Sequence, residues 1–63
     1  METVDVFIAS GESKNKAFVN VSIVEQMDNS VRCVTPTGSE VNFKNCTIIV
    51  VDLANKEIIL KKE

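Results

Sequence analysis

The sequence contains no histidine, tryptophan or tyrosine, and these absences exclude several kinds of site. Without histidine, the chain cannot build a histidine-based metal site or a histidine acid–base centre. Its three aromatic residues are all phenylalanine, so rings on which nucleic-acid bases could stack are scarce. The only glycines are Gly11 and Gly38, which excludes a glycine-rich phosphate-binding loop.

Cysteine is also scarce, because the chain contains only Cys33 and Cys46. Two cysteines do not make the dense disulfide framework of small secreted domains, and their separation matches no zinc or CxxC redox pattern. We therefore expect both to be reduced, buried side chains that act as small hydrophobes. Nothing in the sequence indicates a metal or another cofactor, and we expect none.

The charge balance is slightly acidic, with seven basic and nine acidic residues and a net charge of −2. This balance argues against a broad basic face for nucleic acid, although it leaves room for a small basic site. No segment approaches membrane-spanning length, and the first residues lack the pattern of a signal peptide, so we expect a cytoplasmic protein. The 63 residues predict one domain, residues 1–63, with limited core of its own.

What is present is a series of short β patterns that fills nearly the whole chain. Apolar and polar residues alternate in the segments that we expect to be strands, and these segments are rich in β-branched residues. The expected strands are residues 4–9, 17–24, 31–35, 39–44, 48–51 and 57–61. Short strands joined by tight turns predict a small all-β barrel rather than a helical or α/β domain.

Two turns have clear sequence signals. Residues 27–30, Met-Asp-Asn-Ser, contain an asparagine, which adopts a positive φ at low cost. Pro36 and Gly38 stand at the second and fourth positions of a type I turn. The strand after this turn should therefore return antiparallel to the strand before it, with Val41 and Phe43 facing the core.

Residues 48–51 are the least ordinary part of the sequence, because four aliphatic side chains follow one another there. In a domain of this size, the outer face of a strand has nothing of its own chain to cover it. Natural proteins usually pair such an apolar edge, since an exposed one promotes aggregation. We therefore expect a second chain to cover one face of this strand.

The segment that leads into this run resembles a known family. Residues 43–48, Phe-Lys-Asn-Cys-Thr-Ile, are similar to the second signature of Sm and Sm-like proteins, including the bacterial RNA chaperone Hfq. Residues 4–11 are similar to the Hfq opening strand and its glycine turn, and residues 27–29 lie where this family has its first RNA-binding loop. The resemblance covers residues 4–52.

The resemblance implies a strongly bent, five-stranded, Sm-like (SH3-like) barrel that assembles into a ring of about five to seven copies of the chain. In such rings the fourth strand of one subunit pairs with the fifth strand of the next. The implied function is binding of single-stranded RNA at the ring pore. The residues carried over to the RNA site are Asp28, Asn29, Phe43, Lys44 and Asn45, and those of the subunit interface are Ile48, Ile49, Val50 and Val51.

The chain also departs from the family pattern. The glycine that usually lies early in the second strand is missing, and Asn45 stands where the family has glycine or histidine. The family's N-terminal helix has no counterpart, and an extra C-terminal strand is expected at residues 57–61.

No catalytic constellation is visible in the sequence, because the serine, threonine and cysteine side chains have no histidine base beside them. We therefore do not expect an enzyme. The alternative to the RNA-binding ring is an SH3-like protein-interaction module of phage or accessory type, which binds a partner through an exposed strand edge and does not bind nucleic acid. In either case we expect neither a membrane nor DNA as a partner.

Overall fold

The computed structural model describes residues 2–63, which form strands and turns without a helix. The expectation of an all-β fold is therefore confirmed. In chain order the strands are β1 (Val4–Ser10), β2 (Ser13–Val21), β3 (Ile23–Gln26), β4 (Ser30–Val34), β5 (Glu40–Lys44), β6 (Cys46–Asp52) and β7 (Glu57–Lys62). Within residues 2–63, no helix has the length and apolar character needed to cross a membrane.

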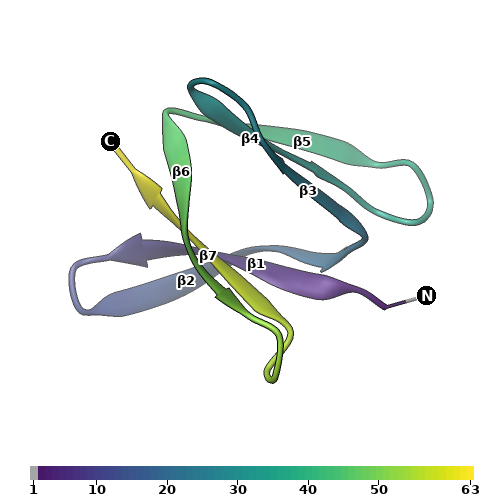
Figure 1. Cartoon of the computed structure of the whole chain (residues 1–63), viewed down its shortest axis with the longest axis horizontal. Coiled ribbons are helices and arrows are strands. Elements are labelled where there is room, and N and C mark those ends of the chain that lie inside the picture. The colour runs from purple at the N-terminus through teal and green to yellow at the C-terminus, as the bar shows by residue number, and fades with distance from the viewer. Residues whose placement is uncertain (1) are drawn as a thin grey trace.

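The strands form two sheets (Figure 1). The four-stranded sheet has the order β2-β1-β7-β6, and the three-stranded sheet has the order β3-β4-β5. All neighbours are antiparallel except β1 and β7, which run parallel with Val6 opposite Ile58. In Figure 1, β6 runs from the four-stranded sheet to the corner where it meets β5 of the other sheet.

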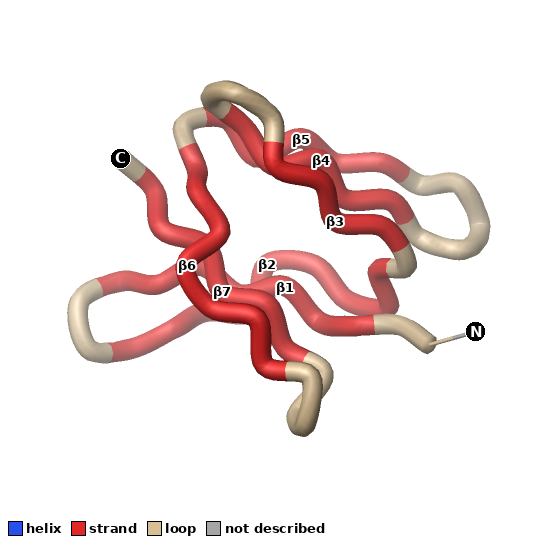
Figure 2. The backbone as a smooth tube through the Cα atoms, in the orientation of Figure 1, coloured by secondary structure: helices blue, strands red, loops and turns tan. Residues whose placement is uncertain are grey.

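The prediction of a closed five-stranded barrel is wrong, because the strands form two sheets. The strand expected at residues 17–24 is broken at a corner, where β2 passes into β3, and β5 passes into β6 through a similarly short connection (Figure 2). The additional strand expected at the C-terminal end is present as β7, and it is inserted between β1 and β6. The result is two separately hydrogen-bonded sheets rather than one closed barrel.

Short polar residues, and no glycine, make the sharp corner between β2 and β3. Asn20 has a φ of 56°, in the left-handed region that asparagine adopts more easily than most residues. Ser22 then ties the corner to β4, because its backbone N–H donates to the Val34 carbonyl at 2.8 Å and its hydroxyl donates to the same oxygen at 3.1 Å. The bend therefore depends on an asparagine and a serine.

Both predicted turns are present. The N–H of Met27 donates to the Ser30 carbonyl at 2.7 Å and closes the connection from β3 to β4. The N–H of Gly38 donates to the Thr35 carbonyl at 2.9 Å, which is the hydrogen bond of a four-residue β-turn. As expected, β5 returns antiparallel to β4, with Val41 opposite Cys33.

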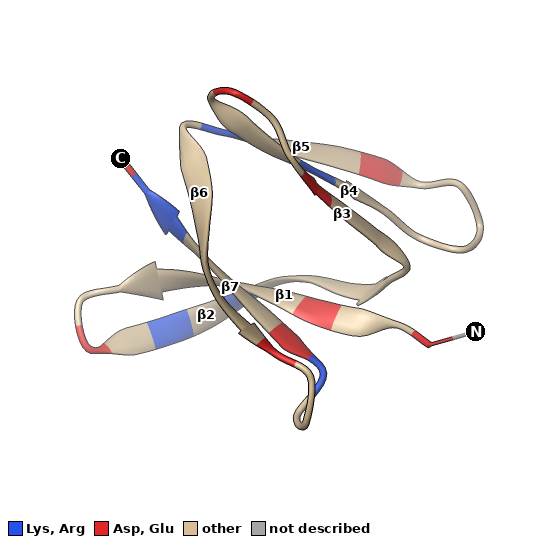
Figure 3. Cartoon of the chain, viewed as in Figure 1, with Lys and Arg blue, Asp and Glu red and all other residues tan. Residues whose placement is uncertain are grey.

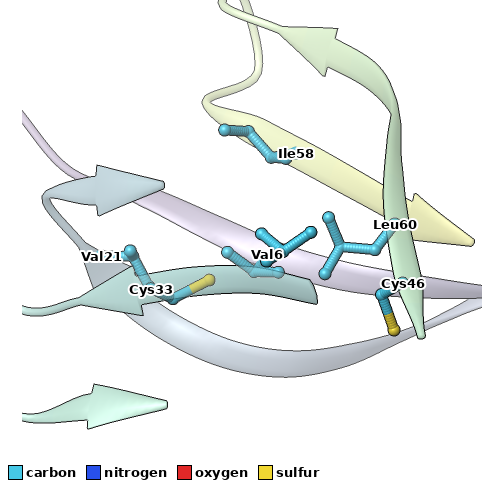
Figure 4. Packing of buried hydrophobic residues seen from close by; sticks show 7 residues of the cluster. Val6, Val21, Cys33, Cys46, Ile58 and Leu60 are labelled. Atoms are coloured by element: carbon cyan, nitrogen blue, oxygen red, sulfur yellow. The ribbon is translucent and has the colours of Figure 1, made fainter. Parts of the chain in front are cut away.

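The core lies between the two sheets, where their inward-facing side chains meet (Figure 4). Its buried members are Val6, Val21, Val31, Cys33, Cys46, Ile58 and Leu60. Both cysteines are buried and unpaired, so their predicted role as small core hydrophobes is confirmed. Burial raises the pKa of the Cys33 thiol to about 11 from its ordinary 9.0, because a thiolate there would lose its hydration.

The opposite face of the four-stranded sheet is covered by lysine side chains. Phe7 is buried there, with the ammonium nitrogens of Lys14 and Lys16 lying 4.7 and 5.7 Å from its ring centroid. The Lys14 ammonium also pairs with Glu57 at 2.5 Å, and that of Lys16 pairs with Asp5 at 3.5 Å. The aliphatic stems of these lysines therefore shield an aromatic ring that the core does not reach.

Candidate functional site

A pocket of about 360 Å³ opens where β5 turns into β6, at one end of the space between the sheets. Its size lies at the lower end of the range for small-molecule sites. Four elements contribute to it: β1, β5, β6 and β7. The residues that line it are Ile8, Asn42, Phe43, Lys44, Asn45, Cys46 and Lys62.

Asn45 forms the corner on which the pocket is built. Its φ of 59° turns the chain out of β5 and into β6. Its N–H donates to the Asn29 carbonyl at 2.6 Å, and its carbonyl accepts from the Glu63 N–H at 2.8 Å. The corner is thus held on both sides, by the turn before β4 and by the end of β7.

The floor of the pocket is apolar because it is the edge of the core. Cys46 is buried, and the half-buried Ile8 and Phe43 pack against the core cluster. Polar groups stand around this floor, namely the side chains of Asn42, Lys44, Asn45 and Lys62 on exposed residues. An apolar floor with a few convergent polar groups is typical of a small-molecule site.

Lys62 reaches the pocket because of the alternation along β7. Ile58 and Leu60 face the core, so the next residue on that face is Lys62, which stands opposite Cys46 of β6. Its neighbour Lys61 stands opposite Thr47 and does not line the pocket. A lysine on the core-facing side of a strand end thus lies at the mouth of the space between the sheets.

In the part of the chain that the structure describes, the two lysines of the pocket have no carboxylate partner. Lys14, Lys16 and Arg32 form ion pairs with carboxylates, whereas within residues 2–63 neither Lys44 nor Lys62 lies within salt-bridge distance of one. No aspartate or glutamate of that range lines the pocket. In Figure 3 the basic ends of β5 and β7 lie on the same side of the molecule, next to the pocket.

The residues predicted for RNA binding are largely brought together. Phe43, Lys44 and Asn45 line the pocket, and Asn29 is joined to Asn45 by a backbone hydrogen bond. Asp28 lies in the same turn as Asn29, and neither residue lines the pocket. The two loops predicted to be adjacent are adjacent within one chain.

Four lining residues were missed from the sequence: Ile8, Asn42, Cys46 and Lys62. The alternation of Ile58, Leu60 and Lys62 was a usable signal for the lysine, because it places that side chain on the core face. Ile8 and Asn42 had no such signal, since only the pairing of distant strands brings them to the pocket.

The residues predicted for the subunit interface fall into two groups. Ile48 packs against the core, whereas Ile49, Val50 and Val51 are 49%, 41% and 55% exposed. A β-bulge between Ile48 and Val50 separates them, because it shifts the register of β6 against β7 by one residue. Leu53, in the turn after β6, is 76% exposed and extends the uncovered group, which we call the apolar hairpin (Ile49, Val50, Val51 and Leu53).

One polar side chain covers the start of the free edge of β6. The amide of Gln26 accepts from the Ile48 N–H at 2.8 Å and donates to the Cys46 carbonyl at 3.4 Å. The same amide donates to the carbonyls of Met27 and Ser30, at 2.8 and 3.1 Å. Gln26 thus links β6 to the turn between β3 and β4.

Metal-ligating side chains do not cluster in the part of the chain described. Residues 2–63 contain no group of three or more histidine, cysteine, aspartate or glutamate side chains placed to hold a metal ion. Both thiols are buried, and the raised pKa of Cys33 keeps that thiol protonated at neutral pH. The pocket is therefore the site that the geometry offers for a ligand.

Fold and pocket together define the chain as a small all-β protein of two sheets with a ligand-sized site at one end. The same fold is found in a crystal structure described as "putative CooT from Carboxydothermus hydrogenoformans". The TM-score is 0.83 at 16% sequence identity, and the match covers 97% of each chain. At this identity the likeness shows the fold. No protein-family model matches the sequence, and no curated protein matches it either.

The predicted Sm-like RNA-binding ring is wrong. The fold matches CooT along nearly the whole chain. The fifth expected strand, β6, pairs along one edge with β7 of the same chain, from Cys46 opposite Lys62 to Asp52 opposite Glu57, and the two sheets do not close into a barrel. The alternative, an SH3-like interaction module, has no support from these comparisons.

Proposed function

We propose that this chain is a non-catalytic binding protein whose ligand is a small molecule held in the pocket at the β5–β6 corner. The observation that carries the proposal is the pocket itself, with its floor of Ile8, Phe43 and Cys46 and its polar rim. The corner needs no rearrangement to present this site, because Asn45 is already fixed by hydrogen bonds on both sides. Such pre-formed sites bind without a large ordering cost.

The absence of a base beside any nucleophile supports binding rather than catalysis. The chain has no histidine, and the only thiol that lines the pocket, Cys46, is buried at its floor. The polar groups at the rim are amides and ammonium groups, which donate hydrogen bonds and orient a ligand. We therefore assign recognition, and no reaction, to this site.

A fragment screen by two-dimensional NMR on the full chain tests this proposal. Bound fragments should shift the backbone amides of residues 42–46 and Lys62 as a group. An Asn42→Trp variant, which fills the mouth of the pocket, should abolish these shifts. The control is Thr47→Trp, an exposed strand position outside the pocket, which should leave them unchanged. Shifts that cluster elsewhere, or that persist in Asn42→Trp, would contradict the proposal.

A second candidate is self-association through the apolar hairpin, so that two copies cover each other's exposed side chains. The favouring observation is that Ile49, Val50 and Val51 are consecutive, exposed and uncharged at the sheet edge. Residues 49–51 carry no charge, so two copies can approach along this stretch as a two-fold interface requires, with the carboxylate of Asp52 at the end of the strand. Apolar edges of this kind are usually covered in natural proteins.

Sedimentation of a matched pair of variants tests self-association. Val51→Lys should convert the protein to a monomer at tens of micromolar, because a buried unpaired charge costs several kcal/mol. Val19→Lys places the same charge on an exposed valine of β2, at the opposite edge of the four-stranded sheet, and should sediment like the parent. A parent protein that is monomeric over the whole range would exclude this candidate.

A further inference from the structure

We infer that the ligand of the pocket is an anion with an apolar body, held by Lys44 and Lys62. The inference rests on the proposed function and adds the chemical class of the ligand. It uses the charge distribution around the pocket, which the size and lining alone do not specify.

The first step concerns where the chain neutralises its cations. Lys14 and Lys16 on the outer sheet face and Arg32 on β4 all have carboxylate partners, at 2.5 to 3.5 Å. Four lysines within residues 2–63 have none: Lys44, Lys56, Lys61 and Lys62. Two of these four line one pocket. In a chain with more acidic than basic residues, a pocket with two lysines and no carboxylate is a local reversal of charge.

The second step concerns how the lysines are placed. They come from different strands, Lys44 from the end of β5 and Lys62 from the end of β7, and the pocket lies between them. Lys62 occupies the core-facing side of its strand, where Ile58 and Leu60 precede it. Lys62 is an exposed residue on that side and lines the pocket.

The third step concerns the neutral donors and the floor. The amides of Asn42 and Asn45 add N–H donors beside the two ammonium groups, and donors of this kind suit carboxylate or phosphate oxygens. Ile8 and Phe43 offer apolar surface on the other side of the same cavity. A ligand that satisfies both sides carries one anionic group and one apolar group, as an aromatic carboxylate does.

The volume limits the size of this ligand. The pocket, of about 360 Å³ and open to solvent, has room for a single ring with its anionic substituent. Asp28 and Glu63 lie in the segments that flank the Asn45 corner, so the excess of positive charge is confined to the lining of the pocket. The site therefore favours a small anion.

The test compares benzoate, benzamide and inorganic phosphate on the full chain by NMR titration. Benzoate should bind about tenfold more tightly than the isosteric neutral benzamide, because hydrogen bonds to a charged group are the stronger ones. Phosphate should bind more weakly than benzoate, since it leaves the apolar floor uncovered. Raising the salt from low to physiological concentration should lower the affinity for benzoate and leave the affinity for benzamide unchanged.

Two neighbouring lysines provide the matched control. Lys62→Ala and Lys44→Ala should each lower the affinity for benzoate about threefold to tenfold and should not change the affinity for benzamide. Lys61→Ala removes the same charge from the adjacent residue of β7, which faces away from the pocket, and should have little effect.

The outcomes separate this inference from the proposed function. If benzoate and benzamide bind in the pocket with equal affinity, the proposed small-molecule site still holds, but the inference that its ligand is an anion is wrong. Equal losses in Lys61→Ala and Lys62→Ala would overturn the assignment of the lysines, because they would show a general charge effect. If none of the three probes binds at about 10 mM, the anion inference fails, and the fragment screen then decides the proposed function by itself.

Discussion

At the scale of single residues, Cys33 shows how burial becomes a dependence of stability on pH. The thiol is fully buried, and its pKa is raised to about 11 in the folded chain from 9.0 in an exposed one. The unfolded chain therefore loses this proton at lower pH than the folded chain. The contribution of the buried Cys33 thiol to the free energy of unfolding is complete below pH 9, and it is lost as the pH rises toward 11.

We predict that the free energy of unfolding falls by about 1–3 kcal/mol between pH 8 and 11 because of this thiol. Urea titrations at several pH values measure it. Cys33→Ala should be less stable at neutral pH and should lack this part of the alkaline decrease. An identical alkaline decrease in parent and variant would assign the effect to other groups.

Asn45 shows a second residue-scale constraint, because its φ of 59° is one that most side chains avoid. Asn45→Gly should keep the corner, whereas Asn45→Val should destabilise the fold by about 1–2 kcal/mol or more, since a β-branched residue is strained in that conformation. Urea denaturation measures both. The control is Asn42→Val on the neighbouring strand β5, which should be nearly neutral. If Asn45→Val were as stable as the parent, the corner would have to adopt another conformation.

At the scale of elements, the stability of β6 depends on a side chain from another strand. β6 pairs with β7 on one side only, and Gln26 supplies hydrogen bonds on the other side, to the N–H of Ile48 and the carbonyl of Cys46. Through this link the end of β3 holds the beginning of β6, close to the pocket. The remainder of the edge, from Ile49 onward, carries the exposed apolar hairpin.

We predict that Gln26→Met, which keeps the length of the side chain and removes its hydrogen bonds, destabilises the protein by about 1–3 kcal/mol. Hydrogen exchange at the Ile48 amide should accelerate more than exchange at amides of β1. Glu25→Met serves as the control, because Glu25 makes only an exposed ion pair with Arg32 at 3.5 Å and its loss should cost less than about 1 kcal/mol. Equal effects of the two variants would contradict the bridging role of Gln26.

At the scale of the whole molecule, a chain of 63 residues has a small core, and covering the apolar hairpin would add to it. If two copies associate there, folding and association are linked by mass action. We predict that the thermal midpoint rises by several degrees when the protein concentration is raised about a hundredfold. Calorimetry at two concentrations measures this rise.

Val51→Lys should remove the dependence on concentration, and Val19→Lys should retain it. A midpoint that is independent of concentration in the parent would show that the chain folds as a monomer. The pocket would not be affected by that result, because all of its lining residues come from one chain.

The sequence by itself determined the features that depend on neighbouring residues. Alternation of apolar and polar side chains located most of the strands, but it did not find residues 13–16, which belong to β2. Pro36 and Gly38 located a turn, and the spacing of the two cysteines predicted buried thiols. The loops that carry Asn29 and Asn45 were also predicted to be adjacent, and a hydrogen bond joins them. Such features are local, because side-chain direction along a strand follows from the two-residue repeat of the backbone.

Only the tertiary structure decided which strands pair. The apolar run at residues 48–51 was interpreted as an edge for another subunit, but β7 of the same chain pairs with one edge of it, and a bulge shifts the register between Ile48 and Val50. The parallel pairing of β1 with β7 places Ile8 opposite Leu60, and this brings β1 to a pocket that β7 closes with Lys62. Pairing between distant strands depends on packing over the whole core, which no short segment encodes. For this reason the sequence predicted Phe43, Lys44 and Asn45 of the site, whereas the positions of Ile8 and Lys62 depend on the fold.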